Sequence, residues 1–364
     1  MANFGGARHD PPELRQAGYR KNFNFYTLFF DCYRLKSGGI RFVGPPPISL
    51  LKALKLSELS TDTSSAKVMD RNDLAMNRIN KVFHMDLLEQ NKSDILQLTI
   101  PHTPTFELTV QPNGEYLYDG KRVLMTMIKY DDLEWLKQWV EFYVKAHGVD
   151  AVLIYNNNAP KFTSYDVNNS LVDIPGLEVV GVIDWDFPYG APAGPSDRFD
   201  SAFTQVGAME HARHRFLGGA KCVINADVDE LVFSHDPNET VCSLVEKAPT
   251  GHLTYHARWA SGKNGYNHAI PPAQRRYCDS YCVNVLIREA GQKWAIVPSK
   301  CPTDSELSVH VVIGMENSPS LSKYICYRNM AEFNSGWKSD RLMEDGIFQL
   351  DETMERTFKE IGWL

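Results

Sequence analysis

The segment KCVINADVDELVF, residues 221–233, leads from a run of apolar residues directly into a cluster of acids. Val223 and Ile224 indicate a core strand, and Asp227 and Asp229 follow at its end. Side chains two apart on a strand point to the same side, so we expect these two carboxylates to converge on one cation. Mg²⁺ or Mn²⁺ is the hard divalent ion that carboxylates bind when phosphate oxygens complete the shell. A solvated acidic turn is the alternative, because an isolated Asp-X-Asp tripeptide is common.

The composition is that of a folded protein with a sizeable core. The chain has 364 residues, of which 43% are hydrophobic, and this length accommodates one large domain with additions or two smaller domains. The net charge is -7, from 38 basic and 45 acidic residues. This balance argues against a nucleic-acid partner and favours a phosphate substrate only where a metal neutralises it.

The cysteines and apolar runs predict a cytoplasmic protein. Seven cysteines without a Cys-X-X-Cys pair indicate reduced thiols rather than a disulfide framework or a zinc site. The N-terminus has no apolar targeting segment, and no window has the length of a membrane span. Six basic residues and several aromatic residues between Arg15 and Arg41 are compatible with peripheral contact at the inner face of the membrane, although we favour a folded accessory element there.

Alternating strands and helices from residue 119 onward predict an α/β domain. The expected elements are a strand at 123–129, a helix at 131–148, strands at 150–157 and 177–184, and a helix at 201–216. This order implies a sheet whose parallel strands carry ligand-binding loops at their carboxyl ends. The Asp227 motif is expected among those loops.

The rest of the chain is less regular. We expect an N-terminal accessory region at 1–118, the main domain at 119–325 and a helical, acceptor-side segment at 326–364. Within the first region, residues 48–59 have helical spacing, and Pro112-Asn113-Gly114 predicts a hairpin turn.

Between about residues 120 and 340, the motifs resemble those of glycosyltransferase family 92 and related family 2 enzymes. The stretch MIKYDDLEWLKQWVEFYVKAHGVDAVLIYNNN, residues 127–158, looks like the opening strand, Trp-containing helix and second strand of that family. The later motifs keep the family's order: Gln205, the Asp227 motif, Trp259 with Ser261 and Gly262, Lys293 to Pro298, and His310. The chain departs from the family pattern at Lys129-Tyr130-Asp131, Asn156 and Lys221-Cys222. The resemblance rests on the order of the whole set of motifs rather than on any single motif.

The resemblance implies the A-type nucleotide-sugar transferase fold, a Rossmann-like mixed sheet flanked by helices. It also implies metal-dependent, inverting transfer of a sugar from a UDP-sugar, with galactose as a guess, to a polysaccharide or glycolipid-linked glycan. Two alternatives stay open. One is a sugar-phosphate transferase or nucleotidyltransferase of capsule assembly, and the other is a catalytically silent binding module.

The resemblance also suggests roles for individual residues. Asp227, Asp229 and His310 are the expected ligands of Mn²⁺ or Mg²⁺, with a buried core histidine as the alternative for His310. Lys129 and Asn156 are expected to hold uracil and ribose, and Asp227, Lys293 and Lys338 are expected to bind the donor. Lys338 and Arg341 are candidates for binding donor phosphate or an acidic acceptor, with a solvated helix face as the alternative. Trp259 and Trp337 are candidates for sugar stacking, with a core position as the alternative. Inverting transfer needs a carboxylate base, for which we choose Asp279 over Asp304 and Glu306.

Overall fold

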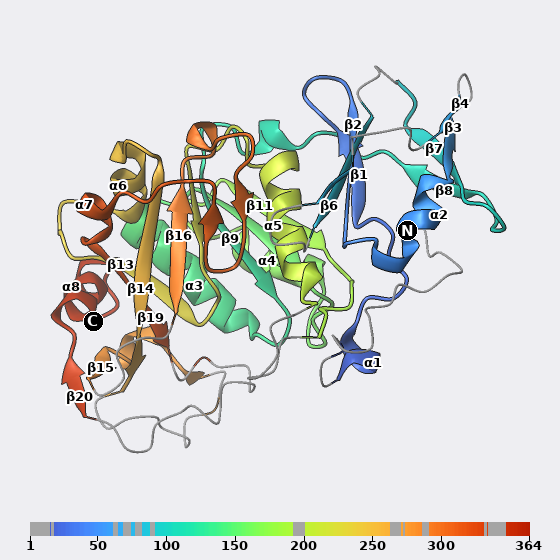
Figure 1. Ribbon diagram of the computed structural model, residues 1–364. Helices are drawn as coiled ribbons and strands as arrows, with labels where there is room; N and C mark the ends of the chain where they lie inside the picture. Colours follow the sequence, from blue (N-terminus) through green and yellow to red (C-terminus); the bar gives the residue numbers. More distant parts are fainter. Residues whose placement is uncertain are drawn as a thin grey trace. The chain divides into compact units, whose positions relative to one another are not determined.

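The computed structural model describes residues 15, 18–60, 65–67, 74–76, 82–87, 92–191, 201–262, 271, 274–285, 291–330, 333 and 347–364 (Figure 1). The chain forms two compact units. The first contains Met1–Tyr116 and Asp186–Phe216, and the second contains Leu117–Trp185 and Leu217–Leu364. The division into three parts expected from the sequence stays a prediction.

The second unit holds most of the strands and the acidic motif. Its elements, with η for 3-10 helices, are η3 (Glu115–Leu117, at the unit boundary), β9 (Arg122–Ile128), α3 (Leu133–His147), β10 (Ala151–Asn156), α4 (Ser164–Leu171), β11 (Val179–Asp184), β12 (Cys222–Asn225), β13 (Glu230–Ser234), α6 (Val241–Lys247), β14 (His252–Ser261), η5 (Tyr277–Asp279), β15 (Cys282–Asn284), β16 (Gln292–Ile296), η6 (Pro298–Lys300), β17 (Glu306–Leu307), β18 (Val312–Ile313), α7 (Pro319–Ser322), β19 (Ile325–Met330), β20 (Phe348–Leu350) and α8 (Glu352–Glu360).

One mixed sheet organises this unit. Its main path is β11-β10-β9-β12-β16-β14-β15-β20, with β19 beside β14 and β13 beside β19. Strands β11, β10, β9 and β12 run parallel, whereas β16 is antiparallel to both of its neighbours. Every residue of β10 is buried, as expected for a parallel strand with both faces covered. The predicted α/β class, a mixed sheet flanked by helices, is confirmed.

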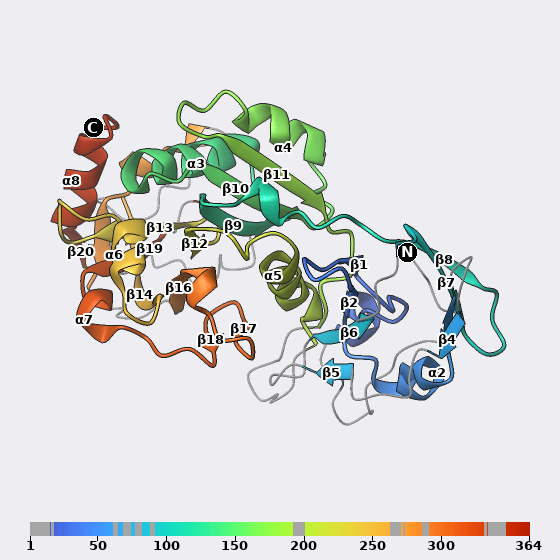
Figure 2. The ribbon, with the colours of Figure 1, turned by 90° about the horizontal axis from the view of Figure 1, so that it is seen from above.

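Helix α3 forms where the sequence predicts a helix. Asp132 caps its start by accepting a hydrogen bond from the Glu134 backbone N–H, and Gly148 ends it with a φ of 65°. Its apolar face is buried in the main core. Figure 2 shows α3 and α4 on the same side of strands β9, β10 and β11.

The first unit contains two 4-stranded sheets, β1-β2-β6-β5 and β4-β3-β7-β8. Its elements are α1 (Tyr19–Asn22), β1 (Asp31–Arg34), β2 (Ile40–Gly44), η2 (Ile48–Leu50), α2 (Leu51–Lys55), β3 (Glu58–Ser60), β4 (Ser65–Lys67), β5 (Leu74–Met76), β6 (Phe83–Leu87), β7 (Ile95–Thr99), β8 (Phe106–Thr109) and α5 (Phe203–Arg215). The helix expected at 48–59 ends earlier, at Lys55, because residues 58–60 pair with β7 as strand β3.

Helix α5 buries polar side chains as well as apolar ones. Glu210 and His211 are both almost fully buried, and α5 lies against β1 and β2. Burial lowers the pKa of His214, on the same helix, to about 4.

The hairpin expected around Pro112-Asn113-Gly114 is wrong. Strand β8 pairs instead with the preceding strand β7, and residues 115–117 form a 3-10 turn. The Asn113 side chain accepts the Glu115 N–H, and the Gly114 N–H is bonded to the Arg215 carbonyl. Asn113 and Gly114 therefore start a turn without returning the chain into a strand.

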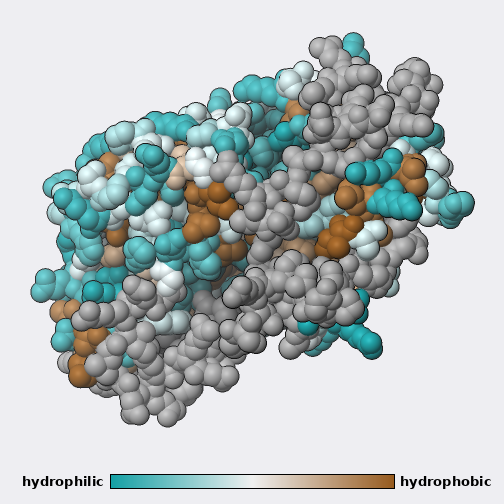
Figure 3. Space-filling view, viewed as in Figure 1, coloured by the Kyte–Doolittle hydropathy of each residue, from teal (hydrophilic) through white to brown (hydrophobic). Residues whose placement is uncertain are grey.

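On the face shown in Figure 3, the coloured residues are mainly hydrophilic, and apolar side chains form a few separate groups. Within the described ranges, none of the helices combines the length and apolarity that crossing a bilayer requires.

Candidate functional site

Three parallel strands end at the same edge of the large sheet. Strand β9 lies between β10 and β12, so residues 129–131, 156–157 and 226–229 follow strands that end side by side. Ligand sites in α/β sheets form at this edge. The structure therefore places the acidic motif where the sequence predicts a binding site.

The acidic residues lie in a tight turn. Asp227 and Asp229 fall between β12 and β13, so the strand alternation assumed from the sequence does not apply to them. The Glu230 N–H bonds to the Asp227 carbonyl at 2.9 Å, and the Asp227 N–H bonds to Glu230 Oε2 at 2.9 Å. Carboxylate oxygens of all three residues nevertheless lie within 4.8 Å of one another. A turn rather than a strand thus brings the carboxylates together, and their convergence on one cation stays a prediction.

Three successive carbonyls of this turn are held by other elements. Tyr277 donates its hydroxyl to the Val228 carbonyl at 2.6 Å, and the Met330 N–H bonds to the Asp229 carbonyl at 2.7 Å. The Glu230 carbonyl accepts Trp139 Nε1–H at 2.9 Å and the Tyr143 hydroxyl at 3.1 Å.

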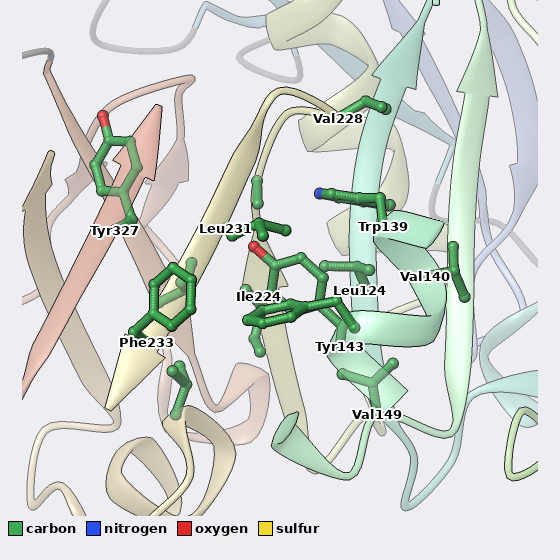
Figure 4. Close-up of a cluster of buried hydrophobic side chains, with 14 of the residues drawn as sticks. Leu124, Trp139, Val140, Tyr143, Val149, Ile224, Val228, Leu231, Phe233 and Tyr327 are labelled. Atoms are coloured by element: carbon green, nitrogen blue, oxygen red, sulfur yellow. The ribbon is translucent and has the colours of Figure 1, made fainter. Parts of the chain in front are cut away.

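Figure 4 shows the aromatic side chains of Trp139 and Tyr143 directed from α3 toward β13. These bonds fix the backbone of the turn, and a fixed backbone preorganises the carboxylates before any ligand arrives.

A buried lysine lies beside two of the acids. The Lys293 side chain, on β16, is fully buried, and its Nζ is 3.0 Å from Asp227 Oδ2 and 3.2 Å from Glu230 Oε2. These contacts are ionic rather than well-aligned hydrogen bonds. Burial alone would lower the pKa of Lys293, but the charges of Asp227 and Glu230 raise it above its usual range. Lys293 is therefore a permanent internal counter-ion.

Four carboxylates gather at the site. Those of Asp227, Asp229 and Glu230 lie together, Asp131 is close enough for Asp227 and Asp229 to shift its pKa, and Lys293 pairs with Asp227 and Glu230. Burial, with Asp229 and Asp227 contributing, raises the pKa of Asp131 to about 6, and burial also raises the pKa of Glu230. Burial is the largest cause of both shifts, and the nearby carboxylates of Asp227 and Asp229 add to it.

A divalent cation fits this donor set. Its ligands would be the oxygens of Asp227 and Asp229, because Glu230 already closes the turn and pairs with Lys293. Asp227 has 33% of its side chain exposed, whereas Glu230 has 4%, so the open side of the cluster is at Asp227. Carboxylate oxygens are the donors that Mg²⁺ and Mn²⁺ prefer.

His310 is not brought into this cluster. In the part of the chain that the structure describes, the groups of three or more His, Cys, Asp or Glu ligand atoms do not include it. The segment around His310, expected to be strand-like, is an exposed hairpin turn between β17 and β18, closed by the Ser308 N–H on the Val311 carbonyl. Its Nδ1 lies 3.0 Å from the Gln292 carbonyl. The role of His310 as a metal ligand stays a prediction.

Lys129 and Asn156 lie at the expected edge. Lys129 Nζ donates to Asn157 Oδ1 at 2.8 Å, and Asn157 donates to the Trp185 carbonyl at 2.7 Å. Asn156 is buried, donates to Ser164 and accepts from the Ala159 N–H. The two asparagines thus shape the loop after β10, and Lys129 supplies its positive charge.

The expected base candidates are spread over two segments. Asp279 ends the 3-10 turn η5, is 42% exposed and pairs with Arg276 at 2.7 Å. Asp304 is exposed in a loop, and Glu306 is buried on β17.

The remaining donor-site expectations divide between described and undescribed residues. Trp259 is buried on β14. Lys338, Trp337 and Arg341 lie outside the described residues, so their roles stay predictions.

Asp131 and Tyr277 belong to the site but were not expected from the sequence. Asp131 follows β9, and its position after a parallel strand was a usable signal. Tyr277 reaches the turn from a 3-10 helix about 50 residues later in the chain, and no local pattern indicates such a contact.

Comparison with known proteins relates the chain to sugar transfer. The model of glycosyltransferase family 92 matches residues 124–331. Comparison with curated proteins gave no match. Among solved structures, the apo structure of the bifunctional glycosyltransferase WbbM is similar, with 9% identity, a TM-score of 0.29, and coverage of 71% of this chain and 41% of that chain. The chain thus spans less than half of the length of that protein.

The family model covers more than half of the chain and includes most of β9 and all of β10, the acidic turn and β19. The expected family is therefore confirmed: this chain belongs to glycosyltransferase family 92.

Proposed function

We propose that this protein is a metal-dependent inverting glycosyltransferase that uses a UDP-sugar to extend a polysaccharide or glycolipid-linked glycan. The observation that carries the proposal is the rigid turn at Asp227–Glu230, whose carboxylates converge at the carboxyl end of a parallel strand. The A-type transferase fold is part of this proposal. UDP-galactose is the first donor to test.

The chemistry explains the residue types. Loss of a nucleoside diphosphate from a sugar passes through an oxocarbenium-like state while negative charge grows on the departing phosphate. A divalent ion, when bound, would supply Lewis-acid neutralisation of that charge. Asp227 and Asp229 would hold the ion, and Lys293 would keep Asp227 oriented by its ion pair.

The nucleoside end of the donor would lie against the loops after β9 and β10. Lys129 is held by Asn157, and Asn157 by the backbone of Trp185. These two hydrogen bonds link Lys129 through Asn157 to the segment that follows β11. A lysine held in this way can donate to a uracil carbonyl or a ribose hydroxyl.

Inversion requires a carboxylate that takes the proton of the acceptor hydroxyl as the glycosidic bond forms on the opposite face of the sugar. We retain Asp279 as the proposed base, with Asp304 and Glu306 as alternatives. Asp279 is exposed enough to meet an acceptor, but it must exchange its Arg276 partner to do so.

The proposed location is the cytoplasm. All seven cysteines are free thiols, and six of them are buried, which agrees with a reducing compartment.

Calorimetric titration of UDP with and without Mn²⁺ tests the proposal. We expect Mn²⁺ to tighten UDP binding in the wild type and in Asp173→Ala, an exposed carboxylate outside the cluster, but not in Asp229→Ala. His310→Ala tests the remaining ligand: a loss of the Mn²⁺ effect with metal-free UDP binding unchanged assigns it to the metal.

Product analysis of a nucleotide-sugar screen separates the alternatives. Release of UDP supports sugar transfer, whereas UMP or pyrophosphate indicates sugar-phosphate or nucleotidyl transfer. Absence of both turnover and metal-coupled UDP binding would identify a silent module and overturn the proposal.

A further inference from the structure

The first unit contains its own group of metal-binding side chains. His84 lies on β6, and Glu210 and His214 lie one turn apart on α5. One ligand atom from each residue lies within 4.8 Å of the others. This group draws none of its members from the acidic turn of the second unit.

The distances are longer than hydrogen bonds but suit a shared ion. His84 Nε2 lies 3.6 Å from Glu210 Oε2, and His214 Nε2 lies 3.4 Å from the same oxygen. Ligand atoms about 2.0–2.1 Å from a tetrahedral Zn²⁺ are separated from each other by about 3.3–3.4 Å. Both imidazoles thus direct one nitrogen toward one carboxylate at the spacing of metal ligands.

The burial of these groups calls for a partner. The side chains of His84 and Glu210 are only 12% and 2% exposed. Both ring nitrogens of His84 are buried without a hydrogen-bond partner. A buried polar atom left without a hydrogen bond is unfavourable, and a metal ion would satisfy Nε2.

The competing explanation is a plain ion-pair network. Arg213 NH1 lies 3.5 Å from Glu210 Oε2, so it neutralises part of the carboxylate charge. In such a network each imidazole donates an N–H to Glu210 Oε2, but at 3.6 and 3.4 Å both contacts are longer than ordinary N–H···O hydrogen bonds.

We infer that His84, Glu210 and His214 bind a divalent transition-metal ion of the zinc class. Two imidazoles and one carboxylate are a ligand set of such ions, with a fourth position left to water. His214, with 20% of its side chain exposed, gives the ion access to solvent. The ion joins α5, from the second segment of the first unit, to β6 of the first segment.

Co²⁺ titration of the metal-free, full-length protein, without a polyhistidine tag, tests the site. We expect saturable visible bands of tetrahedral Co²⁺ that Zn²⁺ displaces. Losing an outer partner of a metal site weakens affinity by about 10–100-fold, so His84→Gln and His214→Gln, which remove direct ligands, should weaken Co²⁺ binding by at least this factor. His211→Gln, which changes a buried histidine of the same helix bonded to Asp31, should retain Co²⁺ binding.

The double variant Asp227→Asn/Asp229→Asn separates the two sites, because it should retain the Co²⁺ bands. If His84→Gln folds poorly, His214→Gln is tested instead, because His214 is the more exposed ligand. Zn²⁺ should raise the melting temperature of the wild type but not that of His214→Gln. Absence of saturable Co²⁺ binding by the wild type overturns the inference, as does unchanged affinity in both histidine variants.

Discussion

Lys293 places its Nζ 3.0 Å from Asp227 Oδ2, and its side chain is fully buried. The acidic turn therefore carries a built-in positive charge before any ion binds. A buried charge that loses its partner typically costs about 3–5 kcal/mol.

We predict that Lys293→Met lowers the free energy of unfolding by about this amount in the absence of metal. Mn²⁺ should then stabilise the variant more than the wild type, because the ion replaces the missing charge. Urea unfolding with and without Mn²⁺ measures both effects, with the exposed Lys161→Met as the control. Equal Mn²⁺ stabilisation of the variant and the wild type would contradict the role of Lys293 as counter-ion.

Asp229→Ala should reduce kcat/KM for sugar transfer by at least about 100-fold, since metal neutralisation of the leaving group contributes several kcal/mol. Asp227→Ala should be severe but retain residual activity. Steady-state UDP release reports both, and Asp173→Ala should behave like the wild type. Near-normal turnover of Asp229→Ala with Mn²⁺ would contradict the proposed role of Asp229 as a metal ligand.

Tyr277→Phe should lower turnover with little loss of fold. The change removes the hydroxyl bonded to the Val228 carbonyl but keeps the ring stacked on Phe333 at 3.7 Å between centroids. The expected cost in stability is about 0.5–1.5 kcal/mol.

Tyr255→Phe is the matched control for Tyr277→Phe, because Tyr255 is buried in the same unit and its hydroxyl bonds to Trp294 rather than to the turn. Activity should fall in Tyr277→Phe alone. Equal turnover in the two variants would show that the turn does not need the Val228 bond.

His147 should make folding pH-dependent. Its Nε2 lies 2.7 Å from the Val232 carbonyl, which only accepts, so Nε2 carries the hydrogen and Nδ1 accepts from the Val241 N–H. Burial lowers the pKa of His147 from 6.5 to about 4. Below pH 6.5 the unfolded chain binds the proton first, so stability falls as the pH decreases from about 6.5 to about 4.

Over this pH range, the titration of His147 lowers the free energy of unfolding by on the order of 2–3 kcal/mol. His147→Gln should be less stable than the wild type at pH 7.5, and its melting temperature should fall less steeply between pH 6.5 and pH 4.5. Parallel pH profiles of the two proteins would show that His147 does not titrate in this range.

Asp279→Asn should lower kcat by at least about 10²-fold with UDP affinity nearly unchanged, because a base acts in the transition state. Transfer kinetics and UDP calorimetry on one preparation separate the two effects. An active Asp279→Asn beside an inactive Asp304→Asn or Glu306→Gln would move the base to the segment before His310. Activity in all three variants would argue against inversion.

The sequence predicted elements with a strong local pattern. Helix α3 and strands β9, β10 and β11 match their expected positions closely. The hydrophobic periodicity and the terminal residues that indicate each element lie within its own segment. The hairpin at Pro112-Asn113-Gly114 failed because the pairing of β8 with β7 is decided by partners outside the motif.

The candidate site was predictable only in part for the same reason. Asp227 and Asp229 were identifiable from the strand that precedes them. Lys293 and Tyr277 reach the turn through tertiary packing, and a single sequence carries no local record of such contacts. The group formed by His84, Glu210 and His214 also escaped prediction, because the packing of α5 against β1 and β2 and the contact of Glu210 with His84 are tertiary.

The bonds that hold the acidic turn also set the order in which the protein can mature. Val228 is held by residue 277 and Asp229 by residue 330, both far downstream. On the ribosome, a nascent chain that has emerged only as far as β14 contains the whole acidic motif but neither of these two hydrogen-bond partners. Contacts over such separations also form late in folding, because closing long loops costs entropy. Metal affinity of the acidic turn should therefore appear only after β19 has been released, which makes it a reporter of the folding of the second unit.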